Sequence, residues 1–464
     1  MKKKSLLRVP HTYVILFGLV VLLAALSYVV PASTYDMMTV GDREVVNPDT
    51  YHLVQSSPVT LMELLTSLPR GLTEASEIVF FIFILGGAFT VIGATGAIEN
   101  GVKATAKRLR FFPSLMIPVL LLLFGILGAT IGLAEETIVF IPLGVMLARS
   151  LGYDAILGVS IIYLGAACGF NAGIMNPFTV GVAQSIAELP PYSGIGLRVA
   201  IFFCFILATT AYLIAYGRRV QRDPSKSLVH ELEEKEAHTR VNLDEEVHFT
   251  GVQKIVLLLF VLSIAVLAYG VFKLGFYITE IAAVFLGLMF LTAIVARMNP
   301  SRVAELFIEG AKDVTMGALV VGLARAILVI LNDGQILYTM VHGVSVVVGQ
   351  FHNTISAVLM FLFQLFLNLL IPSGSGQAAT TMPILVPLSD IVGITRQTAV
   401  LAFQLGDGIS NSIIPTGGSL LAALSIAKIP YERWVKFIFP LIVIWSLIGA
   451  CFMVFAVLTS YGPF

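Results

Sequence analysis

Long apolar runs alternate with short polar connections along almost the whole chain. A run of about 20 apolar residues crosses the roughly 30 Å hydrocarbon core of a bilayer as a helix. Runs of this kind predict membrane-spanning helices at 12–31, 77–98, 195–216, 252–271, 276–296, 314–331 and 434–458. Two further runs, 153–187 and 397–427, contain GFNAGIMNP and GDGISNSIIPTGG, whose Gly, Asn and Pro residues interrupt a helix. We therefore predict nine spans, two of them broken.

Two more apolar stretches, 113–150 and 354–393, are each split by a polar kink. Lysine and arginine concentrate on the cytoplasmic side of membrane proteins. All the basic clusters lie on the cytoplasmic side only if each split stretch enters and leaves the membrane on the same side. The basic clusters are Lys2–Lys4, Lys103/Lys107/Arg108/Arg110, Arg218/Arg219/Arg222, Arg297/Arg302 and Arg433/Lys436. We therefore predict two re-entrant hairpins, a cytoplasmic amino terminus and a cytoplasmic linker at 217–251.

An internal repeat divides the chain. MELLTSLPRGLTEASEIV (62–79) resembles AELFIEGAKDVTMGALV (304–320), and Pro142 and Gly152 recur 241 positions later as Pro383 and Gly393. On this span count an odd number of crossings separates equivalent points, so the copies are inverted relative to each other, as is typical of transporters. The predicted fold is an all-α polytopic membrane protein with two inverted repeats, each containing a re-entrant hairpin and a broken transmembrane helix.

The repeat also predicts the division of the chain into parts. These are a first span and scaffold part at 1–112, a transport part at 113–216, the linker at 217–251, a linker span and second scaffold part at 252–352, and a second transport part at 353–464.

Composition agrees with a bilayer as a partner, since 57% of the 464 residues are hydrophobic and only 12% are charged, against about 25% charged residues in soluble domains. A formal net charge of zero argues against a nucleic-acid partner.

The kink of the first hairpin reads GATIGLAEETIVFIP and places Glu135 beside Glu136. Unpaired carboxylates at membrane depth would each cost several kcal/mol, so a bound ligand is a reason to keep them. In the repeat register this kink lies opposite IPSGSGQAATTMP (371–383), the kink of the second hairpin. Inverted symmetry brings both tips together near the midplane, where non-helical backbone is tolerated only if it lines a cavity.

The two tips and the two helix breaks supply the candidate binding groups. They are Glu135, Glu136, Thr137, Asn171 and Asn176 in the first copy and Ser373, Gly374, Ser375, Gly376, Gln377, Asp407, Asn411 and Thr416 in the second. Carbonyls freed at the end of a half-helix attract a cation, and amides at the start of one attract an anion. The candidate coupling ion is a proton, or sodium near Glu136, Asn171, Asp407 and Asn411, and no other cofactor is expected.

Structural roles compete with these assignments. Gly-rich breaks also allow close helix packing, as in Gly165-x₃-Gly169-x₃-Gly173. The paired glutamates could serve the fold alone, and Asp407 could cap a half-helix without touching a ligand. Arg325, the one basic residue deep in a span, has three alternatives. It pairs with a carboxylate of the site, contacts a carboxylate of the substrate, or extends to a membrane interface.

The motifs together resemble a known family. GLAEETIVF, GFNAGIMNP, PSGSGQAATTMP and LAFQLGDGISNSIIPT are similar to the YfcC-type carriers of the DcuC-like (four-carbon-dicarboxylate anaerobic carrier) group, in the ion transporter superfamily. The resemblance runs from the first span to the last. It implies a dimeric secondary transporter of the bacterial inner membrane that moves its hairpins by an elevator mechanism. Members nearest in pattern are assigned to amino acids, especially arginine and ornithine, and the wider group includes dicarboxylate carriers.

The hairpin tips depart from those of the sodium-coupled relatives, which carry Ser-Asn-Thr. This chain has Ala134-Glu135-Glu136-Thr137 and Ser373-Gly374-Ser375-Gly376. We therefore predict a secondary active transporter of small charged solutes, favouring amino acids with a cationic side chain. The alternative is a Na⁺- or H⁺-coupled four-carbon dicarboxylate carrier. A passive channel would more often show a ring of equivalent residues, and an enzyme is not expected because all seven histidines lie near span ends or in loops.

Overall fold

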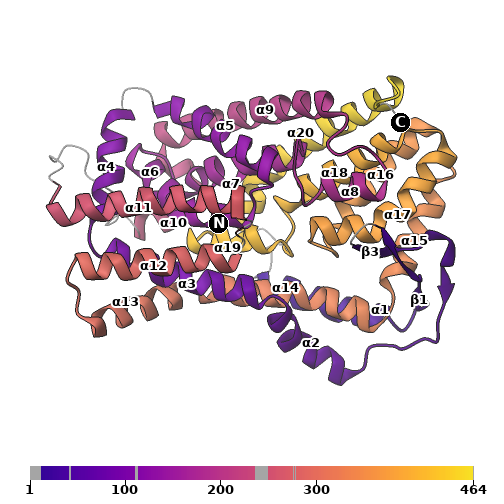
Figure 1. The fold of residues 1–464 in the computed structure, drawn as a ribbon, viewed down its shortest axis with the longest axis horizontal. Helices are drawn as coiled ribbons and strands as arrows, with labels where there is room; N and C mark the ends of the chain where they lie inside the picture. The colour runs from indigo at the N-terminus through magenta and orange to yellow at the C-terminus, as the bar shows by residue number, and fades with distance from the viewer. Residues whose placement is uncertain are drawn as a thin grey trace, which may run out of the picture.

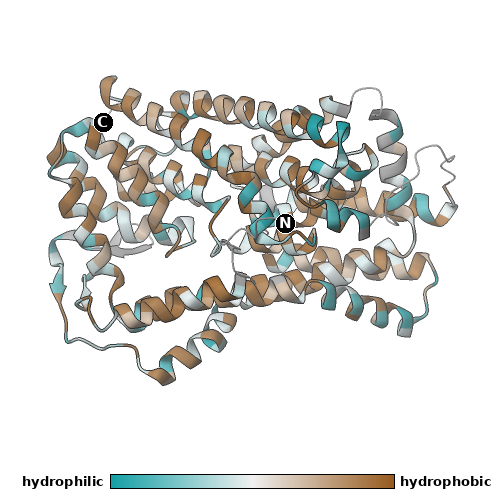
Figure 2. Ribbon diagram, turned by 180° about the vertical axis from the view of Figure 1, so that it is seen from behind, coloured by the Kyte–Doolittle hydropathy of each residue, from teal (hydrophilic) through white to brown (hydrophobic). Residues whose placement is uncertain are grey.

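The computed structural model describes residues 12–40, 43–109, 113–235, 249–274, 276 and 278–462. The predictions for Lys2–Lys4, for Arg110 and for residues 236–248 of the linker lie outside these ranges. Long helices run roughly along the long axis of the molecule (Figure 1), and apolar residues dominate most of them (Figure 2). Large apolar side chains such as Leu207, Val261 and Leu447 face outward, which suits contact with lipid.

Apart from one long connection between α1 and α2, the first half of the described chain is mainly a series of helices. They are α1 (Thr12–Leu26), α2 (Leu61–Glu74), α3 (Ser76–Gly93), α4 (Ala97–Leu109), α5 (Pro113–Ile131), the 3₁₀ helix η2 (Glu135–Phe140), α6 (Ile141–Ser150), α7 (Ala155–Ala172), α8 (Val180–Ile186) and α9 (Ile195–Arg222). The predicted first hairpin is therefore α5, η2 and α6. The helix break at 173–179 separates α7 from α8, where GFNAGIMNP predicts it.

The second half repeats this order. Its helices are α11 (Gly251–Tyr269), the π-helix η5 (Gly270–Leu274), α12 (Ile278–Val295), α13 (Pro300–Asp313), α14 (Thr315–Asp333), α15 (Leu337–Val348), α16 (Asn353–Leu367), α17 (Gly374–Val392), α18 (Arg396–Asn411), α19 (Gly418–Ile426) and α20 (Tyr431–Leu458). Lengths match as well, because α2 and α13 both have 14 residues and α9 and α20 both have 28. The two halves thus correspond helix by helix from α2 and α13 onward.

Packing between helices follows the same correspondence. The helix α2 of the first half packs on α14 of the second half, and α13 of the second half packs on α3 of the first. Within each half the first helix of the hairpin packs on the helix before the break, α5 on α7 and α16 on α18. The helices α7 and α18 also pack on each other. The paired helices α9 and α20 lie side by side along one long edge (Figure 1). The hairpins and broken helices therefore share one packed unit.

Membrane-spanning capacity follows from length and hydropathy. Among the described residues, five helices are long and apolar enough to cross a bilayer alone, namely α3, α7, α9, α12 and α20. A bent pair, 300–313 with 318–333, adds a sixth if it forms one span. The shorter apolar helices include α1 and α11, where the sequence predicts full spans. The protein is thus a multi-pass membrane protein.

The connection between α1 and α2 corrects the prediction of an all-α fold. It contains two small antiparallel sheets, β1 (Ser33–Thr34) with β4 (His52–Leu53) and β2 (Met37–Val40) with β3 (Arg43–Val46), and a 3₁₀ turn η1 (Pro48–Thr50). Counting apolar runs overlooks such a connection because it is polar overall. Its β-branched residues around a Gly-Asp pair nevertheless favour a short hairpin.

The first part of the predicted linker is folded against the rest of the protein. The helix α9 runs on to Arg222, and η3 (Pro224–Lys226) and α10 (His230–Lys235) follow. Glu233 is buried, pairs with Arg149 at 2.9 Å and accepts a hydrogen bond from the backbone N–H of Ala155. Asp154 caps α7 and accepts hydrogen bonds from Tyr216 and Ser227. An acidic residue count alone does not separate such ion-paired acids from solvated ones.

Close packing explains two of the three spaced glycines of α7. A Cβ atom at Gly169 would lie 1.9 Å from the carbonyl oxygen of Gly125 on α5, and one at Gly165 would press on Leu121 at 3.1 Å. Gly173 instead ends α7 in the left-handed conformation, with φ of 59°, which favours glycine. The packing interpretation therefore holds for the first two positions and the helix-break interpretation for the third.

Candidate functional site

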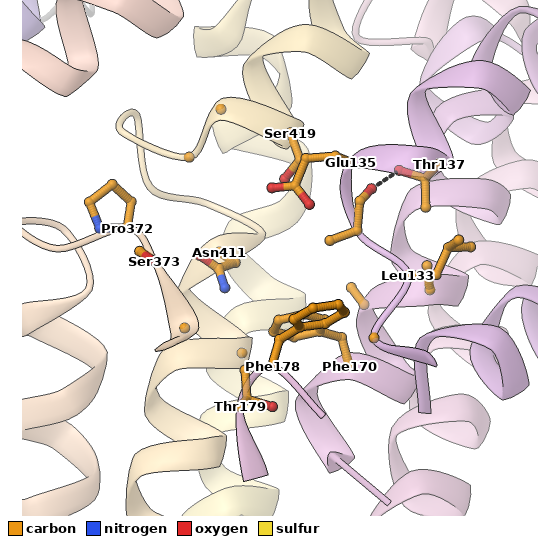
Figure 3. Close-up of a pocket in the computed structure, with 18 of the residues that line it drawn as sticks. Leu133, Glu135, Thr137, Phe170, Phe178, Thr179, Pro372, Ser373, Asn411 and Ser419 are labelled. Atoms are coloured by element: carbon orange, nitrogen blue, oxygen red, sulfur yellow. Dashed lines mark hydrogen bonds between the residues drawn. The ribbon is translucent and has the colours of Figure 1, made fainter. Parts of the chain in front are cut away.

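Both hairpin tips and both helix breaks meet at one cavity of about 260 Å³ (Figure 3). Much of the predicted set lines it: Glu135, Glu136, Thr137, Asn171, Ser373, Gly374, Ser375 and Asn411, together with Arg325. These residues come from η2, α7, α14, α17 and α18. Segments more than 200 residues apart in the sequence thus converge, as the repeat register predicts.

Five predicted residues do not line the cavity: Asn176, Gly376, Gln377, Asp407 and Thr416. Asn176 and Thr416 lie in the two helix breaks, and the other three lie on α17 and α18. The Asn176 side chain accepts a hydrogen bond from the backbone N–H of Phe178, and Gln377 donates to Gln364. Gly376 donates its backbone N–H to Ser373, which caps α17. Asp407 and Thr416 are buried.

The two adjacent glutamates have different surroundings. The Glu136 carboxylate turns back and accepts a hydrogen bond from the backbone N–H of Ala134 at 3.0 Å. Thr137 donates to the carbonyl oxygen of the same alanine at 2.5 Å, so both side chains hold the turn of the tip. Glu135 instead extends toward Ser419 across the cavity (Figure 3). No ion pair within the described residues involves either glutamate.

Arg325 has a partner that none of the three alternatives included. Its Nε donates to the carboxylate of Glu74 at 3.0 Å, and both side chains are partly exposed. The pair joins the end of α2 to the middle of α14, which pack on each other. Arg325 still lines the cavity. Sequence reasoning missed Glu74 because it ends an amphipathic helix outside the apolar runs, 251 positions from its partner.

Several cavity residues escaped the sequence analysis. They are aliphatic, aromatic, small or hydroxyl residues: Ile78, Gly132, Leu133, Ala134, Tyr163, Ala166, Ala167, Phe170, Phe178, Thr179, Pro372, Gly408, Ser412, Gly417, Gly418 and Ser419. Apolar helix positions such as Tyr163 and Phe170 give no signal of their own. Ser419 follows the second break directly, so extending that motif by one residue would have included it.

Backbone carbonyls at the second break are not free, contrary to expectation. Tyr163 donates its hydroxyl to the carbonyl oxygen of Asn411 at 3.1 Å, and Trp434 donates to that of Ser412 at 2.9 Å. Tyr431 donates to the carbonyl oxygen of Ile413. Buried carbonyls need such partners, and here aromatic side chains supply them. These three carbonyls therefore each have a protein partner already.

Asn171 offers the clearest unused binding capacity in the cavity wall. Its side chain is fully buried, and neither its amide nitrogen nor its oxygen has a hydrogen-bond partner among the described residues. Because a buried amide without partners is costly, a ligand that both accepts and donates hydrogen bonds would stabilise it. The cavity thus combines an unpaired carboxylate, a free amide, hydroxyls and the amino-terminal end of α17.

Family comparison agrees with a transport role. The family model of the C4-dicarboxylate anaerobic carrier, DcuC, matches residues 9–458. The chain belongs to the DcuC family. A relative of Escherichia coli (strain K12), named "Putative basic amino acid antiporter YfcC", is 34% identical over 92% of both chains. An uncharacterized protein of Haemophilus influenzae is 30% identical over 98% of both chains.

Two solved transporters also match this DcuC-family chain. The YdaH transporter of Alcanivorax borkumensis covers 98% of this chain and 100% of its own, with a TM-score of 0.43 and 15% identity. MtrF of Neisseria gonorrhoeae, described with a class of antimetabolite efflux pumps, covers 98% and 97%, with a TM-score of 0.43 and 17% identity. Both likenesses span nearly the whole chain at low sequence identity. Membership of the DcuC family therefore rests on sequence.

Proposed function

We propose that this DcuC-family member is a secondary active transporter of small charged organic solutes, with amino acids carrying a cationic side chain, such as arginine or ornithine, as its preferred substrates. One observation carries the proposal. Glu135 and Glu136 stand on one tip of the cavity without a basic partner among the described residues, while Glu74 already neutralises Arg325. A partly buried negative charge without a counter-ion favours a cationic ligand.

Each part of such a substrate has a matching group. The cationic side chain would meet the Glu135 carboxylate, and Asn171 would add hydrogen bonds. The α-carboxylate would meet the start of α17, where Ser373, Gly374 and Ser375 line the cavity. A helix amino terminus presents unpaired N–H groups and a partial positive charge to an anion. The 260 Å³ cavity limits the substrate to a small solute.

A second candidate is a Na⁺- or H⁺-coupled carrier of four-carbon dicarboxylates. The description of the family favours it, since the DcuC model is that of a C4-dicarboxylate carrier. Charge opposes it, because a doubly negative ligand beside Glu135 and Glu136 would add repulsion in a region of low dielectric constant. Such a carrier would need co-bound cations to offset that repulsion. The name of the Escherichia coli relative, which mentions basic amino acids, supports the first candidate.

The proposed mechanism is an elevator. In it the two copies are inverted repeats, and the transport parts 113–216 and 353–464 slide against the scaffold parts 1–112 and 252–352. Support comes from the matching helix order of the halves and from the cavity wall, which combines the tips of both hairpins with Ile78 and Arg325 of the scaffold. We further propose a homodimer in the bacterial inner membrane with a cytoplasmic amino terminus.

Counterflow in reconstituted vesicles tests the proposed function. Vesicles loaded with unlabelled arginine should accumulate labelled arginine transiently and saturably, and ornithine in the lumen should serve as well. Succinate in the lumen should not support this uptake. Counterflow with succinate alone would promote the dicarboxylate candidate, and uptake without saturation or counterflow would indicate a channel.

A further inference from the structure

Asp407 is a fully buried acid directly behind the cavity. It lies on α18, has no exposed surface and does not line the cavity. Neither carboxylate oxygen makes a hydrogen bond to a described residue. Asn411, on the next turn of α18, and the acid Glu135 lie close enough to act on its carboxylate. A buried carboxylate in this position is unfavourable as an isolated anion.

No basic side chain balances this charge from the elements packed around α18. These elements are α7, α8, α16, α17 and α20. Helices α8 and α16 contain no charged residue, and Tyr163 of α7 already donates to a backbone carbonyl. The charged residues of α20 are confined to its first turns, and Asp390 of α17 lies at its far end beside Arg396. Arg325 across the cavity is paired with Glu74.

The tip of hairpin two lies against Asp407. A Cβ atom at Gly374, on this tip, would lie 3.5 Å from Oδ2 of Asp407 and 2.6 Å from the side chain of Thr179. A sodium ion needs several oxygen ligands, whereas a proton needs only the carboxylate itself. Because neither carboxylate oxygen has a hydrogen-bond partner among the described residues, a proton on the acid removes the cost of a buried charge.

We propose that Asp407 is the proton-binding site that couples transport to the proton gradient, separate from the substrate cavity on the other side of the Gly374 tip. The inference rests on the proposed function and adds its coupling ion. In the empty site Asp407 carries a proton on one carboxylate oxygen. When a substrate of net charge +1 binds, its cationic side chain neutralises Glu135, and the loss of that negative neighbour favours the ionised form of Asp407. The O–H bond of the acid breaks, and the proton passes to water when the tip moves away.

The cycle is therefore an exchange of one cation for one proton. The carrier crosses in one direction with the substrate bound and Asp407 ionised, and returns empty with Asp407 protonated. Each crossing carries the same net charge, so the exchange is electroneutral. Exchange of one substrate molecule for another uses only the loaded form and requires no proton step.

Transport by Asp407→Asn tests the loaded crossing. The variant has a permanently neutral side chain of similar size that resembles the protonated acid, and Asp390→Asn, at the exposed pair with Arg396, is the matched control. With Asp407→Asn we expect both arginine counterflow and accumulation driven by an imposed pH gradient to fall about tenfold or more, because the loaded carrier crosses only with an ionised acid. The control should retain both. Persistent counterflow or pH-driven accumulation by Asp407→Asn, or a sodium-driven flux that this variant abolishes, would each overturn the proposal.

A spectroscopic measurement tests the proton without relying on transport. In substrate-free purified protein, infrared spectra should show the C=O stretch of a protonated carboxylic acid that disappears in Asp407→Asn and persists in Asp390→Asn. Arginine should release protons from the wild type into weakly buffered solution but not from Asp407→Asn. A spectrum without an Asp407-dependent band would refute the site. If the band is present and the wild type shows no arginine counterflow, the proposed substrate fails while the proton site stands.

Discussion

The backbone N–H of Ala134 donates a hydrogen bond to the Glu136 carboxylate at 3.0 Å, and this bond makes two adjacent acids unequal. Glu136 holds the turn of the hairpin tip, whereas Glu135 extends into the cavity without an ion pair among the described residues. The sequence shows only that both acids are present. Their different roles depend on the direction of each side chain, which the 3₁₀ geometry of η2 sets.

The first prediction follows from that difference. Glu135→Gln should lower arginine counterflow by about tenfold or more, because a hydrogen bond to a charged group contributes about 1.5–3 kcal/mol. Glu136→Gln should have a smaller effect, since the amide oxygen of Gln can still accept from Ala134. Counterflow rates and melting temperatures of both purified variants check this. Equal losses in transport would show that the two acids act on the substrate alike.

The second prediction concerns Glu74, which the structure places on Arg325. Glu74→Gln removes the neutralising charge and leaves a positive Arg325 at the cavity wall. Arginine binding should weaken and succinate binding should strengthen, each by several-fold, about 1 kcal/mol for a partly exposed charge. Binding isotherms for both ligands measure this change.

Asp333→Asn is the matched control for Glu74→Gln. Asp333 pairs with Arg70 between the same two helices, α2 and α14, but lies outside the cavity wall. Its substitution should leave the selectivity between arginine and succinate unchanged. A parallel loss of both ligands with Glu74→Gln would instead mean that the pair maintains the shape of the cavity.

The positions of the hairpin tips and helix breaks could be predicted from the sequence, because Gly, Asn and Pro interrupt a helix at their own positions. The residues that stop α7 and α18 do so in any surroundings, so their positions follow from the sequence. The amphipathic helices α2 and α13 escaped the count of apolar runs, and with them Glu74. The hydrogen bond from Tyr163 to the backbone of Asn411 could not be predicted, because it joins residues 248 positions apart and depends on how the two broken helices cross.

The third prediction concerns the contact between α5 and α7. Gly169→Ala should prevent correct packing, because the added methyl group would meet the Gly125 carbonyl oxygen at 1.9 Å. Overpacking of this severity costs about 1–3 kcal/mol or more. Gly287→Ala on α12 is the control, since a Cβ there has no neighbour within 4 Å. The yield of monodisperse protein and its melting temperature should fall only for Gly169→Ala.

The fourth prediction concerns the folded start of the linker. Glu233→Gln breaks the pair with Arg149 and leaves a largely buried arginine uncompensated. Removing one partner of a buried pair costs about 3–5 kcal/mol, so the melting temperature should drop clearly and trypsin should cleave near Arg222 and Lys226 faster. Glu231→Gln, at an exposed acid 3.8 Å from Arg433, should change neither. An unchanged cleavage rate in Glu233→Gln would mean that this pair does not hold the segment in place.

The last prediction tests the sidedness that the basic clusters imply. Asp49 lies in the connection between α1 and α2, and Glu234 lies on α10; both are exposed. With nine spans and two re-entrant hairpins, these residues face opposite sides of the membrane. Single cysteines at each position, in a background where Cys168, Cys204 and Cys451 are replaced, should react differently with a membrane-impermeant maleimide. In intact spheroplasts, Asp49→Cys should label and Glu234→Cys should label only after permeabilisation. If both label in intact spheroplasts, a hairpin crosses the membrane completely, and the inverted arrangement of the two halves must be abandoned.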